Sequence, residues 1–213
     1  MNLDLDIIEN ELKHRLEYPY KWYRKQNDIW DKYTNFIYKT ETWEALIPKI
    51  AATVKAYNLD KKELFYYAIN RWYNFWSAMA VEQIFCSCNG IVPEKNSKNR
   101  LVDFRIQNIP FDHKTSVFPR GFNQLFEYAK KNPRELIEWL YKNQSSQKRF
   151  HTKNRLFIVV HDKTGDHWKL KSEISILKKE INNYISNFDS SQLQKFIFTS
   201  QTETFSDIIW INK

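Results

Sequence analysis

The sequence predicts an α/β protein with a central mixed β-sheet flanked by helices and preceded by an N-terminal helical extension. Three observations predict this class. Long segments with apolar residues at helical spacing alternate with short apolar runs typical of strands. Only three glycines occur among 213 residues, which disfavours a barrel or sandwich with many tight turns. Hydrophobic residues make up 42% of the chain, which is enough for one sizeable core.

The helical extension is expected to span residues 1–58. Leucines and isoleucines at helical spacing predict one helix over 3–17, and a second is predicted over 40–58, with Thr40 or Thr42 as its N-cap. Between them, residues 18–38 mix aromatic and basic side chains. Such a mixture can stack on bases and neutralise phosphates, but its near-helical spacing favours packing in a core.

Residues 59–213 are expected to form the α/β core as one compact unit. The helix predicted over 61–85 is apolar nearly all round, so a charged Glu82 near its end needs Arg71, another base or a metal site as partner. Within 121–143 two helices are predicted, the second beginning at Pro133. The other expected elements are strands near 87–92, 101–107, 111–117, 155–161, 168–170, 196–199 and 207–211, and a helix over 172–188.

Residues 101–116, LVDFRIQNIPFDHKTS, carry three groups suited to chemistry on two adjacent strands. Alternation in the first strand puts Asp103 on its polar side. A connection at 108–110 is expected to turn the chain. In the second strand Asp112 and Lys114 share one face, because successive side chains point to opposite faces. Two carboxylates and an ammonium are therefore expected to converge where the strands part.

This combination suits hydrolysis of a phosphodiester. Two neighbouring carboxylates repel each other, and Mg²⁺, which prefers oxygen ligands, accepts both in ionised form. A lysine two positions after the second carboxylate can contact a water bound to the metal or the phosphate that this water attacks.

The order of elements over residues 60–162 resembles the core of the PD-(D/E)xK, or restriction-endonuclease-like, nuclease superfamily. By this resemblance Asp103, Asp112 and Lys114 take the motif positions, and Glu82 takes the acidic position on the helix. Val102 stands where the motif has proline. The resemblance implies a Mg²⁺-dependent endonuclease acting on DNA, of the restriction type among others, in which Mn²⁺ is expected to substitute for Mg²⁺.

The resemblance also implies a role for each residue of the site. Asp103 and Asp112 would bind the metal, together with the main-chain carbonyl of His113 and with Glu82. Lys114 would position or activate the attacking water.

The charge of the chain predicts the class of partner. A formal net charge of +8 favours polyanions, and nucleic acid is the leading candidate. DNA is the expected substrate, with RNA left open, and a homodimer is one assembly that would let the protein cut both strands. Residues 142–155 contain no acid, so Lys148, Arg149 and Lys153 are predicted contacts for a nucleic-acid backbone, as is Arg120. A solvated loop would have the same composition.

Several features point to a cytoplasmic protein without a membrane partner. No apolar run approaches the roughly 18 residues that a spanning helix needs, and the start of the chain is acidic, unlike a signal peptide. Cys86 and Cys88 are too few for a four-ligand zinc site and are expected to be reduced thiols.

Two other functions fit the same residues. A catalytically inactive nucleic-acid-binding protein on the same fold would bind with strong salt dependence and without turnover. In a helical interaction protein, Asp103, Asp112 and Lys114 would form a surface ion pair, with side chains that point apart. His161 and His167 flank a Lys-Thr-Gly turn and are more typical of exposed hairpin residues than of metal ligands.

Overall fold

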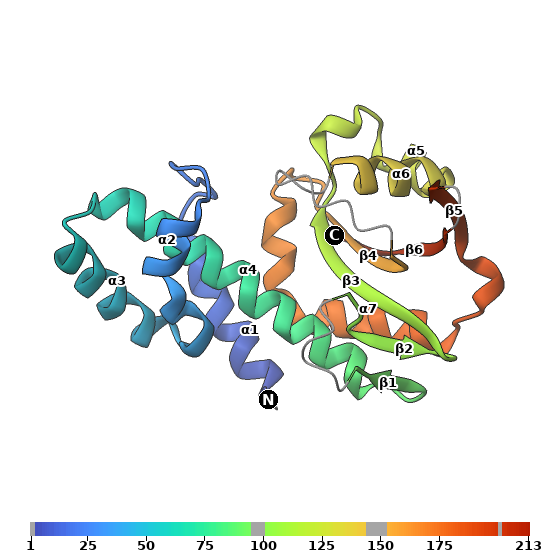
Figure 1. Ribbon diagram of the computed structural model, residues 1–213, viewed down its shortest axis with the longest axis horizontal. Helices are drawn as coiled ribbons and strands as arrows, with labels where there is room; N and C mark the ends of the chain where they lie inside the picture. Colours follow the sequence, from blue (N-terminus) through green and yellow to red (C-terminus); the bar gives the residue numbers. More distant parts are fainter. Residues whose placement is uncertain (1–2, 95–100, 144–152, 200–201) are drawn as a thin grey trace. The chain divides into compact units, whose positions relative to one another are not determined.

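The chain forms two compact units that share one long helix. The computed structural model describes residues 3–94, 101–143, 153–199 and 202–213 (Figure 1). The first unit comprises residues 1–81 and 171–175, and the second comprises residues 82–170 and 176–213. Helix α4 (Lys61–Ser87) contributes to both, so the division falls inside this helix and differs from the expected boundary at residue 58.

The first unit is built from helices around the first part of α4. This helix begins after Asp60, whose carboxylate accepts a hydrogen bond from the backbone N–H of Glu63 at 2.7 Å. The indole N–H groups of Trp72 and Trp76 donate to backbone carbonyls, so these fully buried rings keep their donors paired. The other helices are α1 (Leu5–Lys13), η1 (His14–Glu17), α2 (Asp28–Tyr33), η2 (Asn35–Lys39) and α3 (Trp43–Tyr57), where η marks a 3₁₀-helix.

Helix α3 begins where the sequence predicts. Thr42 is its N-cap and accepts a hydrogen bond from the backbone of the third residue of the helix. The buried side chains are Leu46, Ile50 and Thr53, whereas Tyr57 in the last turn is 52% exposed.

Helix α4 has 27 residues and is buried nearly all round between Leu64 and Phe85, as predicted. It still carries charged and polar side chains along its length. Neither α4 nor any other helix in the described ranges is long and apolar enough to pass through a lipid bilayer.

The second unit contains a six-stranded mixed sheet, which confirms the predicted α/β class. The strand order is β1-β2-β3-β4-β6-β5, with β4 parallel to both of its neighbours and the remaining pairs antiparallel. Strand β4 is buried along almost its whole length, as expected of a central strand. The strands are β1 (Ile91–Pro93), β2 (Phe104–Ile106), β3 (Ile109–Val117), β4 (Arg155–His161), β5 (Gln194–Thr199) and β6 (Thr202–Asn212).

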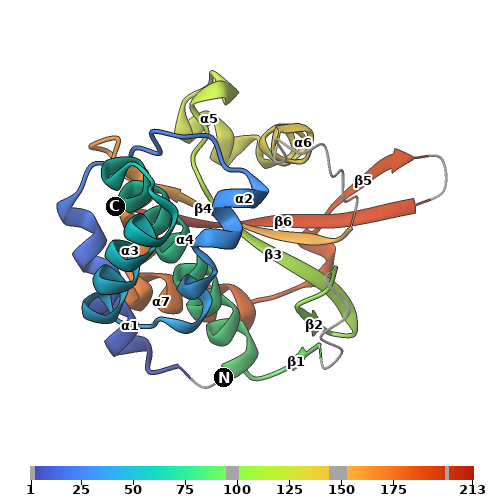
Figure 2. The ribbon, with the colours of Figure 1, turned by 60° about the vertical axis from the view of Figure 1, so that its left-hand side comes forward.

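Helices cover both faces of this sheet (Figure 2). On one face, α5 (Phe126–Lys131) and α6 (Pro133–Asn143) pack over an apolar cluster that includes side chains of β4, β5 and β6. On the other face lies α7 (Ile174–Ser186), whose Tyr184 hydroxyl donates to Asp207 of β6 at 2.9 Å. Three 3₁₀-helices complete the chain: η3 (Arg120–Phe122), η4 (His167–Ser172) and η5 (Ser190–Gln192).

Two connections differ from the sequence prediction. The turn between β2 and β3 consists of Gln107 and Asn108, with φ of 48° and 67°, and Pro110 belongs to β3. Two successive positive φ values are typical of a type I′ turn, which suits the twist of a hairpin. Residues 168–170 belong to η4 and form no strand, because His167 accepts a hydrogen bond from the backbone N–H of residue 162 and folds the segment back into a helical turn.

Candidate active site

The β2–β3 hairpin brings Asp103 and Asp112 together. The last paired residues of the two strands are Phe104 and Phe111, so the two acids are the next residues, where strand pairing ends. The backbone N–H of Asp103 donates to the carbonyl of Phe111 at 2.8 Å and holds this residue against β3. Both phenylalanines are fully buried and anchor the hairpin in the core.

Asp103 is fixed by two hydrogen bonds from one residue. Its Oδ2 accepts from the backbone N–H of His113 at 2.8 Å and lies 2.6 Å from Nδ1 of the same residue. Burial raises the pKa of Asp103, but the hydrogen bonds and charge of His113 outweigh it, and the pKa falls below its ordinary value. The Asp103 carboxylate thus accepts the hydrogen bond from the His113 N–H that a backbone carbonyl of β2 would accept if this strand were longer.

The His113 imidazole is packed between rings and carboxylates. Its side chain is 8% exposed and contacts Phe85 and Phe104. Burial lowers the pKa of His113, whereas the hydrogen bond to Asp103 and the charges of three nearby carboxylates raise it, and the net shift is upward. The site therefore stabilises the protonated form of His113 relative to a free imidazole.

Asp112 is held from the neighbouring strand by Arg155, the first residue of β4. The register of β3 and β4 pairs these two residues, and Nε of Arg155 donates to Asp112 Oδ2 at 2.6 Å while Nη2 contacts the same oxygen. The guanidinium also lies over the rings of Tyr141 and Phe157. Burial raises the pKa of Asp112, Arg155 lowers it and Asp103 raises it again, so the net shift is upward.

The charge of Glu82 interacts with the charges of Asp103 and His113. It lies in the last turns of α4, and burial followed by the charge of Asp103 raises its pKa, while His113 lowers it. Arg71, one of the partners that the sequence suggests for Glu82, pairs with Asp31 at 3.1 Å. The charge of Glu82 therefore acts on the acids of the hairpin.

Lys114 follows Asp112 on the same face of β3. Its side chain reaches solvent, yet the protein atoms around the ammonium and the charge of Arg155 lower its pKa, against the opposing effect of Asp112. A lowered pKa increases the fraction of neutral amine near neutral pH, which is the form able to accept a proton.

Three acidic and three basic side chains lie in this region. We call them the hairpin cluster: Glu82, Asp103, Asp112, His113, Lys114 and Arg155. No set of three or more His, Cys, Asp or Glu side chains within the described ranges is arranged to hold a metal ion. No protein-family model, curated protein or solved structure matches this chain. The chemistry of the hairpin cluster is therefore the basis for assigning a function.

The predicted nucleic-acid contacts lie in different places. Arg120 begins η3, which follows the end of β3 at Val117, and the hairpin cluster lies nearer to the other end of this strand. The structure therefore does not bring Arg120 to the acids. Lys153 is exposed and precedes Arg155 by two positions, which puts it next to the cluster. Lys148 and Arg149 lie outside the described residues.

His161 and His167 form a stacked pair with ring centroids 4.8 Å apart. His161 also stacks on Phe126 at 3.9 Å, and Nδ1 of His167 accepts a hydrogen bond from the backbone N–H of Asp162 at 2.9 Å. Burial lowers the pKa of both imidazoles. The pair closes the connection after β4 through packing and hydrogen bonding.

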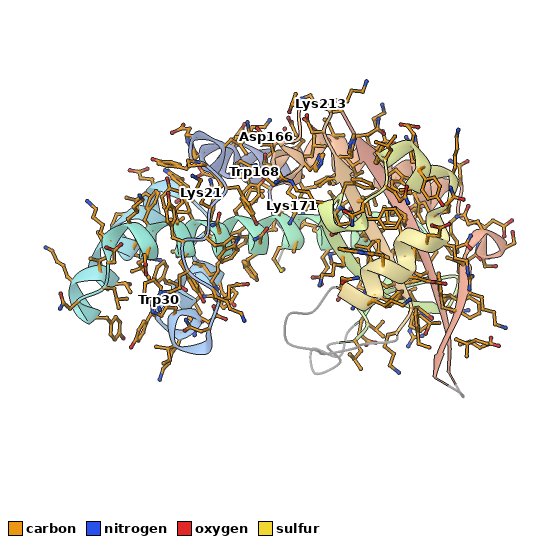
Figure 3. The ribbon with its side chains drawn as sticks, turned by 90° about the horizontal axis from the view of Figure 1, so that it is seen from above. Lys21, Trp30, Asp166, Trp168, Lys171 and Lys213 are labelled. Carbon is orange, nitrogen blue, oxygen red and sulfur yellow. The ribbon has the colours of Figure 1, made fainter. Side chains whose placement is uncertain are left out.

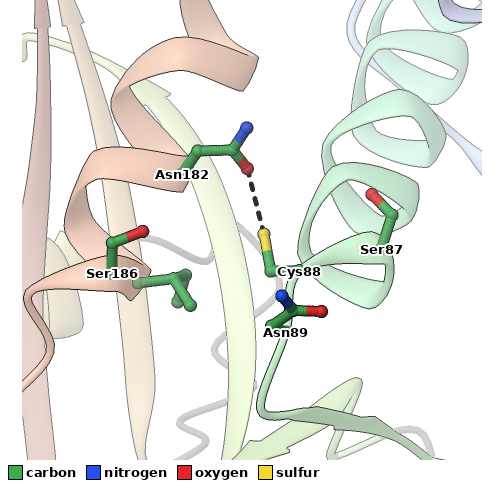
Figure 4. Close-up of a pocket in the computed structure, with 6 residues that line it drawn as sticks. Ser87, Cys88, Asn89, Asn182 and Ser186 are labelled. Atoms are coloured by element: carbon green, nitrogen blue, oxygen red, sulfur yellow. Dashed lines mark hydrogen bonds between the residues drawn. The ribbon is translucent and has the colours of Figure 1, made fainter.

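A cavity of about 490 Å³ lies between the end of α4 and α7 (Figure 4). Its described lining consists of short polar side chains and one isoleucine: Ser87, Cys88, Asn89, Asn182, Ile185 and Ser186. Cys88 Sγ lies 3.1 Å from Oδ1 of Asn182, and burial raises the pKa of this thiol. A raised pKa makes the thiol a weak nucleophile, and no residue of the hairpin cluster lines the cavity.

Sequence reasoning missed the basic partners of the two acids. A role is predicted from the sequence only for the main-chain carbonyl of His113, not for its imidazole. Arg155 is predicted at the end of a basic segment, without a carboxylate partner. A signal for Arg155 is present in the sequence, since a cation directly before the apolar run LFIVV needs a carboxylate on a neighbouring strand when that run is buried. For the His113 ring no such signal exists, because its partner depends on where the pairing of β2 ends.

Proposed function

We propose that this protein is a Mg²⁺-dependent nuclease that hydrolyses phosphodiester bonds of DNA and has a restriction-endonuclease-like core. One observation carries the proposal: Asp103 and Asp112 end the pairing of one hairpin, close enough for Asp103 to raise the pKa of Asp112, and Lys114 lies two positions further on. The order α4, β1, β2, β3, α5, α6 and β4 supports it, because the resemblance to the PD-(D/E)xK superfamily implies a helix, three strands, helix and strand in this order.

The proposed metal site rests on the chemistry of the acids, because carboxylate oxygens are the ligands that a hard divalent cation prefers. The pKa of Asp112 is raised even though Arg155 is paired with it, because burial and the charge of Asp103 together raise this pKa by more than Arg155 lowers it. A bound Mg²⁺ would stabilise the ionised form of Asp112. Asp103 and Asp112 would hold the ion, with the His113 main-chain carbonyl and Glu82 as further oxygen donors. The ion would act as a Lewis acid and activate a water molecule.

The bases of the cluster act on the water and the phosphate. Lys114, with its lowered pKa, orients the attacking water and accepts its proton. The Arg155 guanidinium keeps Asp112 in one orientation, and its fixed array of donors suits a phosphate oxygen. Lys153, exposed beside the cluster, neutralises a neighbouring phosphate of the DNA backbone.

The test of this function is cleavage of supercoiled plasmid and of single-stranded DNA in the presence of Mg²⁺. Lys114→Ala should lower the rate by about 100-fold or more, the size of effect typical of a lost general base. Asp112→Asn should lower the rate at least as strongly, because it removes a ligand of the metal. Lys163→Ala, an exposed lysine in the turn after β4, serves as the matched control and should cleave like the wild type. Equal cleavage by all of these proteins would remove the assignment.

Metal binding gives a readout that does not depend on turnover. Mn²⁺ or Mg²⁺ should raise the thermal midpoint of the wild type, because an ion that binds only the folded state stabilises it. Asp103→Asn and Asp112→Asn should abolish this increase, measured by differential scanning calorimetry. An increase of the same size in both variants would exclude these carboxylates as ligands.

A nucleic-acid-binding protein without catalysis is the second candidate. The favouring observation is that both hairpin acids already have basic partners in the protein, Asp103 with His113 and Asp112 with Arg155. This function predicts salt-dependent DNA binding in EDTA and no heat of Mg²⁺ or Mn²⁺ binding in calorimetry. Measurable metal binding would decide in favour of the nuclease.

A further inference from the structure

A row of aromatic side chains runs along the first unit. Consecutive ring centroids lie 6.1, 5.7, 5.1, 5.5 and 4.8 Å apart. In order along the row, which we call the aromatic row, the residues are His14, Trp43, Tyr18, Phe65, Tyr66 and Tyr23. Every one of them is at least partly exposed. His14 and Tyr23, at the two ends of the row, are the most exposed, whereas the other four rings are half-buried and the buried Trp72 supports the row through Trp43.

Tyr23 ends the row and is its most distinctive member. Its side chain is 44% exposed, and its backbone φ is 53°, a left-handed conformation that bulky residues rarely adopt. The ring contacts Tyr66 and lies 4.7 Å from the ammonium of Lys62. The surrounding structure thus holds an aromatic ring at the surface in an unfavourable backbone conformation, a feature that clusters at binding sites.

Cations lie on the two segments that carry this end of the row. Residues 18–27 contain Lys21, Arg24 and Lys25, all exposed, and no acid. Figure 3 labels Lys21 on this segment. Two more exposed lysines, at positions 61 and 62, open α4, and the nearby Glu63 is paired with Arg24 at 3.0 Å. Rings interleaved with lysines form a surface that complements a chain of phosphates and bases.

We propose that the aromatic row and its lysines bind single-stranded nucleic acid. Unpaired bases would stack on the exposed rings, and the lysines would neutralise the backbone phosphates. Every base has a π-face, so successive rings bind a strand with little dependence on sequence. A net charge of +8 for the whole chain favours this polyanion over a protein surface. The proposal does not rest on the nuclease, because the row needs no metal and lies in the first unit, whereas the hairpin cluster belongs to the second.

The experiment measures fluorescence anisotropy of a labelled oligo-dT of about 20 nucleotides, longer than one stacking site needs, with the full chain in EDTA, where metal-dependent cleavage is absent. Tyr23→Gly removes the ring and relieves the positive φ, so the fold is retained. Loss of one stacking ring should weaken binding by about 5- to 150-fold. Tyr23→Trp should bind like the wild type. The matched control is Tyr128→Ala, which removes an exposed tyrosine of the second unit and should leave binding unchanged.

Two further measurements separate stacking from general charge attraction. A duplex of the same length should bind more weakly than the single strand, because its bases are already stacked. The double variant Lys21→Gln/Lys25→Gln should lower the slope of log affinity against log salt by about 0.7 for each phosphate that is no longer neutralised. The proposal is overturned if the duplex binds as tightly as the single strand, or if Tyr23→Gly binds as tightly as Tyr128→Ala.

Discussion

Arg155 donates through Nε to Asp112 Oδ2 at 2.6 Å, and this bond joins the start of β4 to the hairpin that carries both acids. The two side chains are only 10% and 21% exposed. In such a site, removal of one partner leaves the other charge desolvated and unpaired. The ion pair therefore helps to hold the start of β4 against β3, whatever chemistry the acids perform.

We predict that Arg155→Met lowers the free energy of unfolding by about 3 kcal/mol, the cost of breaking a buried pair from one side. Urea denaturation at neutral pH measures the change. Arg134→Met is the control, because Arg134 pairs with Glu138 where the side chains are 53% and 40% exposed. That exposed pair should contribute less than about 1 kcal/mol. Similar losses in both variants would contradict the prediction.

The second prediction concerns the pH dependence of His113. Its folded-state pKa is raised above the ordinary value of 6.5, so protonation stabilises the fold. This contribution is complete below the unfolded-state pKa and is lost as pH rises through the folded-state value. His113→Gln should therefore cost more stability at about pH 5.5 than at about pH 9, as measured by urea titrations.

His161 provides a control of opposite sign for this prediction. Its folded-state pKa is lowered by burial and by His167, so the wild type gains stability from this residue as pH rises. His161→Gln should then cost more at high pH than at low pH. If both variants show the same pH trend, the assignment to His113 fails.

Third, Thr115→Val should raise the free energy of unfolding by about 1 kcal/mol. Among the described residues, Thr115 Oγ1 is the buried side-chain oxygen or nitrogen atom without a hydrogen-bond partner. An isosteric methyl group removes the desolvation penalty of an unpaired hydroxyl. At Thr34, whose Oγ1 donates to the Trp30 carbonyl at 2.7 Å, the same substitution should instead lower stability. Calorimetry of both variants tests the contrast.

Fourth, replacing Gln107-Asn108 with Asn-Gly should stabilise the protein by about 1 kcal/mol. Both residues have positive φ, and Asn-Gly is the pair that type I′ turns prefer. The acids keep their register, since the length of the turn does not change. Gln107→Val should have the opposite effect because β-branched residues avoid this conformation. Equal thermal midpoints for the two variants would be the contradicting result.

Local patterns in the sequence predict much of this fold. The run LFIVV gives β4, the apolar surface of residues 61–85 gives α4, and alternation around Asp103 gives the β2–β3 hairpin, because each signal depends on neighbouring residues only. The partners of the acids could not be predicted in this way. Arg155 meets Asp112 from 43 positions away, through strand register, which no local pattern contains.

The aromatic stretch shows the same limit. Near-helical spacing within residues 18–38 favours packing of a stripe of side chains in a core, and Trp30 is buried as expected. Tyr23, which lies outside that stripe, is 44% exposed, has a positive φ and contacts Tyr66 of α4. Periodicity describes which residues share a face, but it does not tell which face the rest of the chain covers.

The two-residue turn between β2 and β3 also sets an order of events during folding. Asp103 and Asp112 are nine positions apart, so closing the hairpin needs only the microseconds typical of such local structures. Arg155 arrives with the parallel pairing of β4, a slower step because a long loop must close first. A newly made chain therefore forms the contact between Asp103 and His113 within the hairpin before Arg155 reaches Asp112.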